Sequence, residues 1–225
     1  MTGSELREAR RKRGWGQVVL AERLGVSQPY VSLLESGTRV VTPRLASKLV
    51  AVLGLPPTAL PVKGEGSPLP PGTAATSLAR LGYSAFGHLR RGRVLNPAEV
   101  LARTLRQAQL EARLVEALPW LLVRYPDVNW NWLVSYAKQH DLQNRLGFVV
   151  TLARELAENR GDGAAAERLR ERERVLENSR LQREDSFAGD ALTEAERRWL
   201  RANRSNEAAQ WNLLSNLSVG TLASA

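Results

Sequence analysis

Several residue types are missing or scarce in this sequence of 225 residues. It contains no cysteine, which excludes disulfide scaffolds, thiol nucleophiles and the common zinc modules. Its two histidines, His88 and His140, lie far apart, which argues against a metal centre or a Ser-His-Asp hydrolase. No apolar run approaches the roughly 20 residues that span a bilayer, and residues 1–14 are rich in arginine where a secretory signal would be apolar. We therefore expect a cytoplasmic protein that is not an enzyme and that uses no metal or other cofactor.

Lysine is scarce too, since almost all of the 32 basic residues are arginines. The choice of arginine is consistent with a bias in genome composition, but the distribution of charge along the chain is uneven. Residues 1–55 carry a net charge of +5 and residues 56–95 one of +4, whereas residues 96–225 are neutral overall. This asymmetry predicts a polyanionic partner for the N-terminal part of the chain.

Helix start and stop signals divide the chain into two helical regions, and no segment has the pattern of a strand. Short helices are expected at about 4–13, 17–24, 28–36 and 43–53, which gives a compact domain over residues 1–55. Residues 56–75 (PPTALPVKGEGSPLPPGTAA) have the composition of a linker rich in proline and glycine. Residues 76–225 are expected to form a second, helical bundle domain, so the fold class is all-α.

The second region begins its main helical run with a strong signal at Asn96-Pro97-Ala98-Glu99. We expect this run to continue to Pro126, with a break or kink near Pro119. Five of the six tryptophans follow in this region; a helical core is the favoured interpretation, and an exposed aromatic surface for a partner or small molecule is the alternative. Arg145 is interpreted either as a surface residue or as a member of a buried ion pair.

The stretch 17–36 (QVVLAERLGVSQPYVSLLES) carries the most specific pattern. It places a small residue, Ala21, in the middle of a first helix, Gly25 at a turn, and apolar Val31 and Leu34 on the inner face of a second helix. Two helices that cross closely at a wide angle need this arrangement, which predicts a helix-turn-helix.

The same stretch resembles the Xre/Cro/lambda-repressor family, whose pattern is Q-x-x-L-A-x-x-x-G-V-S-x-x-x-V-S-x-x-E-x-G. The matching positions are Gln17, Leu20, Ala21, Gly25, Val26, Ser27, Val31, Ser32, Glu35 and Gly37. The flanking helices also fit, so the resemblance covers residues 4–55 and implies a four- or five-helix DNA-binding domain of the Cro/lambda-repressor type.

This resemblance implies that helix 28–36 lies in the major groove of double-stranded DNA. It assigns base contacts to residues at the start of that helix, and phosphate or flanking contacts to residues around it. The base-contacting set is Gln28, Pro29, Ser32 and Leu33, with Gln28 facing adenine and Pro29 or Leu33 facing a thymine methyl group. The remaining set is Gln17, Ser27, Thr38, Arg39 and Arg13, together with Tyr30, which either touches the sugar-phosphate chain or packs inside.

One acidic residue, Glu35, and most of the basic run Arg10 to Arg13 lie near this surface but are not expected to contact DNA. Glu35 would repel DNA, so we expect it to be structural and to bond the backbone of the next loop. The run Arg10 to Arg13 is expected to be solvated, and only Arg13 is expected to contact DNA.

We therefore expect a sequence-specific transcriptional regulator, a homodimeric repressor whose neutral C-terminal half supplies self-association. The alternative is the antitoxin of a toxin–antitoxin pair, because residues 110–158 are weakly similar to antitoxin-like and effector-binding regions of bacterial repressors. In that case the C-terminal helices would bind the toxin, and the N-terminal domain would regulate the operon.

Overall fold

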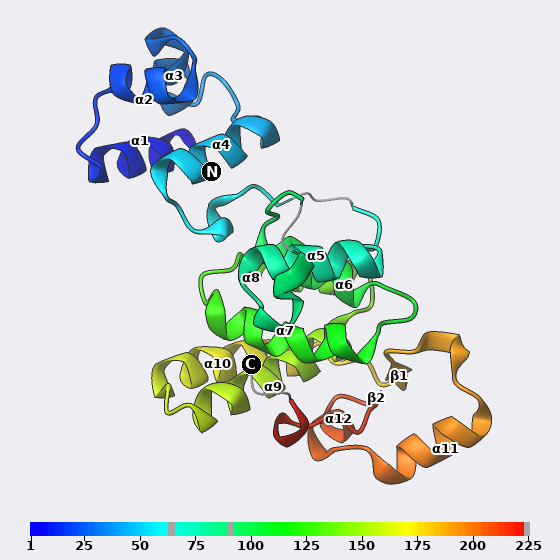
Figure 1. Ribbon diagram of the computed structural model, residues 1–225. Helices are drawn as coiled ribbons and strands as arrows, with labels where there is room; N and C mark the ends of the chain where they lie inside the picture. The colour runs from blue at the N-terminus through cyan, green and yellow to red at the C-terminus, as the bar shows by residue number, and fades with distance from the viewer. Residues whose placement is uncertain (63–65, 90–91, 223–225) are drawn as a thin grey trace. The chain divides into compact units, whose positions relative to one another are not determined.

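The computed structural model describes residues 1–62, 66–89 and 92–222, and these residues form two compact units. The first unit consists of Met1–Val62 and Val94–Asn96, and the second of the described residues of Lys63–Arg93 and Pro97–Ala225. In Figure 1 the first unit runs from blue to cyan and the described part of the second from cyan through green and yellow to red. The described chain is largely helical, as the sequence predicts.

The first unit is a small bundle built on short helices. Its elements are α1 (Gly3–Lys12), α2 (Gln17–Leu24), α3 (Gln28–Glu35), α4 (Pro43–Leu53) and the 3-10 turn η1 (Pro57–Ala59). Capping residues define most of the helix starts: the side chains of Thr2, Ser27 and Thr42 each accept a backbone N–H from the first turn that follows. The helices enclose one apolar core, formed by Leu6, Leu20, Ala21, Leu24, Val31, Leu34, Leu49 and Leu53.

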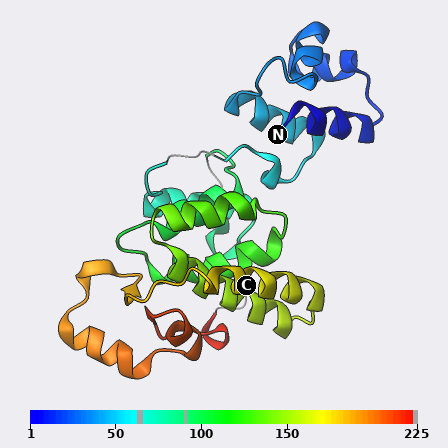
Figure 2. The same ribbon diagram turned by 180° about the vertical axis from the view of Figure 1, so that it is seen from behind.

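The second unit is a larger helical assembly in which α9 is central. Its elements are α5 (Pro71–Leu81), η2 (Ser84–Leu89), α6 (Pro97–Leu105), α7 (Ala112–Arg124), α8 (Trp130–Gln139), α9 (Gln143–Asn159), α10 (Gly163–Glu177), β1 (Asp185–Ser186), η3 (Gly189–Ala191), α11 (Glu194–Asn203), α12 (Asn206–Gln210), β2 (Leu213–Leu214) and η4 (Val219–Thr221). Residues 143–153 of α9 are all buried, because the helix contacts α10, α7, α8 and the C-terminal segment. In Figures 1 and 2, α9 and α10 lie side by side.

The stretch expected to be a linker is partly structured. The first unit extends to Val62, and α5 begins at Pro71, inside the range 56–75 that its composition marks as linker. Proline fits the first turn of a helix because its missing N–H would have no partner there. Ala74 and Leu78 then bury one face of α5. The sequence also predicts a basic loop at residues 88–93, and residues 90 and 91 of it lie outside the described residues.

The helical run from Pro97 is broken at a different place from the one expected. The chain leaves the α-helix after Leu105 and re-enters it at Ala112, whereas Pro119 lies inside α7. The buried side chain of Arg145 supplies the reason, because its Nη1 donates to the carbonyl oxygens of Leu105 and Gln107, both at 2.9 Å. These carbonyls at the end of a helix thereby gain a partner from a distant element.

Of the two interpretations of Arg145, a surface residue or a member of a buried ion pair, the structure confirms the second. Its Nε and Nη2 donate to the carboxylate of Asp185 at 2.9 and 3.0 Å, and Nη2 also donates to the carbonyl oxygen of Ser186 at 2.6 Å. Residues 185 and 186 form β1, which pairs in parallel with β2. The sequence did not predict this strand pair, because two residues are too short to show an alternating pattern.

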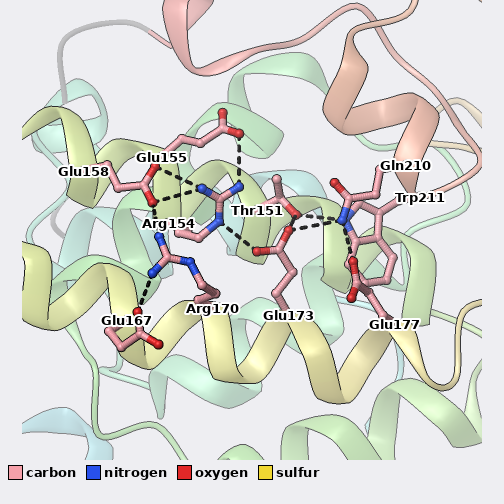
Figure 3. Close-up of polar contacts among 10 residues, drawn as sticks. All are labelled: Thr151, Arg154, Glu155, Glu158, Glu167, Arg170, Glu173, Glu177, Gln210 and Trp211. Atoms are coloured by element: carbon pink, nitrogen blue, oxygen red, sulfur yellow. Dashed lines mark hydrogen bonds and ion pairs between the residues drawn. The ribbon is translucent and has the colours of Figure 1, made fainter.

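The C-terminal segment is held against α9 and α10 by a tryptophan and a polar network, shown in Figure 3. The Trp211 ring is fully buried, and its Nε1 donates to Thr151 Oγ1 at 2.8 Å. Thr151 in turn donates to Glu173 Oε1 at 2.6 Å, and Arg154 Nε donates to Glu173 Oε2 at 2.8 Å. Gln210 donates to the neighbouring Glu177 at 2.7 Å. These bonds satisfy polar groups that would otherwise be buried at the junction.

None of the helices in the described ranges has both the length and the apolar character needed to cross a membrane.

Candidate nucleic-acid interface

The turn between α2 and α3 is short, and specific residues define it. Gly25 ends α2 with a φ of 62°, a left-handed conformation that glycine adopts without a steric penalty. Ser27 then caps α3, since its Oγ accepts the backbone N–H of Tyr30 at 3.4 Å. Ala21 is buried in the shared core, where its small side chain allows the two helices to approach closely. The sequence thus specifies the crossing of α2 and α3 locally.

α3 has a buried face and an exposed face. Val31, Leu34 and Glu35 are buried against the core. Gln28 and Pro29 at the start of the helix are exposed, and further exposed or half-buried side chains on the helix are Leu33, Ser32 and Tyr30. The Tyr30 side chain packs partly against the core, which agrees with the second of its two expected roles. The N-terminal end of α3 is therefore the part of this helix that is most accessible to a partner.

A chain of hydrogen bonds runs from the core of the unit to this exposed end. Arg10 Nε and Nη2 donate to the two carboxylate oxygens of Glu35 at 2.6 and 2.9 Å. Gln17 Nε2 donates to Glu35 Oε2 at 3.0 Å, and Gln28 Nε2 donates to Gln17 Oε1 at 2.6 Å. We call these four residues the Arg10–Gln28 relay. It holds the first side chain of α3 in a defined orientation.

The buried end of the relay is an ion pair that the sequence did not reveal. The Glu35 carboxylate has no exposed surface, and only 9% of the Arg10 side chain is exposed. Burial alone would raise the pKa of Glu35, but hydrogen bonds from Arg10 and Gln17 and the charges of Arg10 and Arg7 hold that pKa below its ordinary value. Hydrogen bonding to Glu35 likewise raises the pKa of Arg10.

Two expectations need correction here. Arg10 was expected to be solvated with its neighbours, but it follows Leu6 by four residues and therefore lies on the same buried face of α1. Glu35 is structural, as expected, yet its carboxylate pairs with Arg10 and Gln17 and not with the backbone of the next loop. The Leu6–Arg10 spacing was a signal that could have placed Arg10 inside.

The flanking residues lie mainly beyond the end of α3. Thr38 is exposed, and its Oγ1 is 2.9 Å from Ser36 Oγ. Arg39 is exposed and makes no ion pair with any residue that the structure describes. Arg13 is exposed as well, but its Nε donates to the carbonyl oxygen of Leu53 at 2.9 Å, so its side chain lies at the C-terminal end of α4. The structure thus brings Gln17 and Gln28 together and places Arg13 in a different environment.

Comparison with known families decides what this arrangement is. The family model described as Helix-turn-helix matches residues 6–60. These residues form a helix-turn-helix domain of the Xre/Cro type. The match covers about a quarter of the chain and supports a DNA-binding, regulatory role for this domain. No curated protein and no solved structure gave a match to the chain.

The family match does not extend to the second unit, whose tryptophans have mixed environments. Trp211 is fully buried, Trp199 is 55% exposed, and Trp130 and Trp132 are half-buried. The core interpretation therefore holds for Trp211 and fails for Trp199. Within residues 1–62, 66–89 and 92–222, no three acidic or histidine side chains are grouped closely enough to hold a metal ion.

Proposed function

We propose that the protein is a sequence-specific transcriptional repressor that binds double-stranded DNA as a homodimer and reads the major groove with α3. The observation that carries this proposal is the Arg10–Gln28 relay, which orients an exposed glutamine at the start of α3. The relay matters because sequence is read by side chains whose position is fixed before DNA arrives.

The geometry of Gln28 favours adenine as its base. A glutamine amide has two N–H donors and one carbonyl acceptor. One Gln28 N–H is used by Gln17, which leaves the second N–H and the carbonyl oxygen for a partner. That pair of groups matches N7 and N6–H₂ of adenine in the major groove. The bond to Gln17 therefore supports a bidentate contact to adenine.

Apolar side chains on the same face extend the proposed readout. Leu33 is 39% exposed and Pro29 is exposed, and each is suited to contact a thymine methyl group. The hydroxyl of Ser32, which is half-buried, lies on the same short helix. Tyr30 is proposed to reach the sugar-phosphate chain with the part of its side chain that is not packed on the core.

Phosphate contacts are proposed for groups at helix starts and in the following loop. The N-termini of α2 and α3 present free backbone N–H groups, at Gln17 and Ser27, which favour an anion. Thr38 and Arg39 follow α3, and Arg39 has no competing carboxylate among the residues described. Arg13 can join this set only by leaving the carbonyl oxygen of Leu53.

A dimer is proposed because one helix-turn-helix reads only half of a palindromic site. Two copies would place their α3 helices about 34 Å apart, one turn of B-DNA. Residues 96–225, which make up most of the second unit, are the proposed self-association region, since they are neutral overall and lack the positive charge of residues 1–95. The antitoxin alternative would use the second unit to bind a toxin instead, and counting the chains on one operator distinguishes the two: the proposal requires two copies of this chain and no other protein.

The test begins by selecting a preferred duplex from random DNA with the full-length chain. Fluorescence anisotropy then compares the selected duplex with a random one for the wild type, for Gln28→Ala, and for Gln139→Ala, which changes an exposed glutamine outside the first unit. Gln28→Ala should weaken binding to the selected duplex by about 1–3 kcal/mol and leave binding to random DNA nearly unchanged. An equal loss on both duplexes would show that Gln28 does not read sequence.

A further inference from the structure

A cavity of about 340 Å³ lies in the second unit, well away in sequence from the helix-turn-helix. Its wall comes from the start of α7, from the segments around β1 and β2, and from α11 and η4. The lining residues that determine its chemistry are Leu110, Val115, Glu116, Phe187 and Leu214. Its volume falls within the range of about 300–1,000 Å³ that is usual for small-molecule sites.

The floor of the cavity is apolar and firmly held. Val115, Phe187 and Leu214 are buried there, and Leu110 joins them. The backbone N–H of Leu110 donates to the carbonyl oxygen of Phe187 at 2.7 Å, which ties the two sides of the floor together. The Phe187 ring also lies against the ring of Phe148 in α9, with centroids 5.8 Å apart. These contacts hold Leu110 and Phe187 in place relative to each other and to α9.

One wall is held much less firmly. It includes Leu200 of α11 and Leu192, which precedes that helix. None of the residues of α11 is buried, and in both Figure 1 and Figure 2 this helix lies at the periphery of its unit. Two of its side chains bond to residues outside the helix. Arg201 pairs with the Glu184 carboxylate at 2.7 Å, and Arg197 donates to the carbonyl oxygen of Gly189 at 2.9 Å. The Arg201 pair is half-exposed and therefore screened by water, so it contributes little to holding α11 in place.

The cavity contains one charged side chain among the lining residues, and it is acidic. Glu116 is half-buried, and its carboxylate makes no hydrogen bond or ion pair with any residue in the described part of the chain. Arg113, one turn earlier on α7, lies over the ring of Phe86 at 6.0 Å instead of pairing with Glu116. The Glu116 charge acts on the Tyr83 phenol, where it helps to raise the pKa that burial already raises. A carboxylate without a hydrogen-bond partner beside apolar walls attracts a cation more strongly than it would in bulk water, because the local dielectric is lower.

We propose that this cavity binds a small lipophilic organic cation, whose apolar body lies on the Val115–Phe187–Leu214 floor and whose ammonium group lies beside Glu116. An anion would be repelled by Glu116, and a neutral apolar molecule would gain only the burial on the floor. The Phe187 ring already lies beneath the Arg145 guanidinium, 5.9 Å from its centroid, so its part in the site is that of an apolar floor. The site does not depend on the proposed repressor function, because its groups all belong to the second unit.

The test uses an isosteric pair of probes that differ in charge. Benzyltrimethylammonium is the cation, neopentylbenzene is its neutral carbon counterpart, and phenylacetate is an anion of similar size. Binding of each to the full-length protein is measured by saturation-transfer NMR, with calorimetry for the cation, in the absence of DNA. The variants are Glu116→Gln, which keeps the shape of the wall, and Glu171→Gln, which removes an exposed carboxylate on α10 as the matched control.

The proposal requires the cation to bind more tightly than both other probes. Glu116→Gln should weaken cation binding by about tenfold, the scale of one partly desolvated charge contact, and leave neopentylbenzene unchanged. Glu171→Gln should leave the binding of all three probes at the wild-type level. The proposal is overturned if the cation gives no signal, if neopentylbenzene binds as well as the cation, or if Glu116→Gln and Glu171→Gln behave alike.

Discussion

The buried ion pair between Arg10 and Glu35 gives the sharpest stability prediction. Arg10→Met removes the guanidinium and keeps most of the side-chain volume. The Glu35 carboxylate, with no exposed surface, then loses its hydrogen bonds at 2.6 and 2.9 Å and keeps the bond from Gln17 at 3.0 Å and the charge of Arg7 at 3.5 Å. Breaking a buried pair in this way typically costs about 3–5 kcal/mol.

That loss is large for a unit of this size. At about 0.05–0.15 kcal/mol per residue, a unit of roughly 60 residues has a stability near 3–9 kcal/mol. Hydrogen exchange followed by mass spectrometry should therefore show α1 to α4 losing most of their protection in Arg10→Met. The helix α9 of the same molecule is the internal reference, because its unit does not contain the pair.

Two further variants make the argument refutable. Arg11→Met changes the neighbouring exposed arginine. It should change the free energy of opening, measured by hydrogen exchange in α1 to α4, by less than about 0.5 kcal/mol. The double variant Arg10→Met with Glu35→Met removes both charges and should recover most of the loss, since the penalty comes from an unpaired buried charge. A loss below about 1 kcal/mol in Arg10→Met would refute this reasoning.

The pH dependence of the same pair follows from the lowered pKa of Glu35. Because this pKa lies below 4.5 in the folded unit, the contribution of the pair is present above pH 4.5. It is lost as the pH falls through the folded-state pKa. Acid should therefore reduce the protection of α1 to α4 in the wild type more than in the double variant.

Three predictions concern the second unit. Arg145→Met removes five hydrogen bonds from a buried guanidinium and should cost about 3–5 kcal/mol in urea unfolding followed by circular dichroism. Gly147→Ala would place a Cβ in steric overlap with the buried Trp211 ring; it should cost about 1–3 kcal/mol and increase proteolysis after residue 203. Burial raises the pKa of Glu155 to about 7, assisted by the charge and hydrogen bond of Glu207. The stability that this group contributes is present below pH 4.5 and lost as the pH rises through about 7, so Glu155→Gln should flatten the decline in melting temperature over that range.

Matched variants accompany these predictions. Gly163→Ala is the control for Gly147→Ala, because a Cβ at Gly163 meets nothing within 4 Å. If the two alanine variants unfold alike, the clash with the tryptophan ring is not real. For Arg145, an exposed arginine changed in the same way, Arg168→Met, should have little effect. For Glu155, the titration of His140 occurs in both proteins and cancels in their difference; identical pH profiles would contradict the assignment.

The local signals in the sequence predicted most of the helices. Ser27 caps α3, Thr193 and Glu196 form the capping box of α11, and Gly25 ends α2 at the turn where it was expected. These features succeed because capping and glycine turns depend on residues only a few positions apart. The accessible face of α3 was predictable for the same reason, since the buried Val31 and Leu34 leave Gln28 on the other side.

The parts that the sequence did not predict depend on contacts between distant residues. Arg10 lies 25 residues from Glu35, and Arg145 lies 40 residues from Asp185. An arginine read alone is expected at the surface, because burial becomes favourable only when its partner is known. The break after Leu105 has the same origin, since Arg145 supplies the donors for the freed carbonyls. The relay to Gln28 likewise needed the folded positions of α1, α2 and α3.

The account depends most directly on the claim that Gln28 reads an adenine in the major groove. A double-mutant cycle tests it: wild type and Gln28→Ala are each titrated against the selected operator, with adenine or 7-deazaadenine at the assigned base pair. The account predicts that 7-deazaadenine weakens wild-type binding by about 1–3 kcal/mol at one position and has almost no effect on Gln28→Ala. The account is contradicted if, at every adenine of the operator, the losses of binding free energy from 7-deazaadenine and from Gln28→Ala simply add.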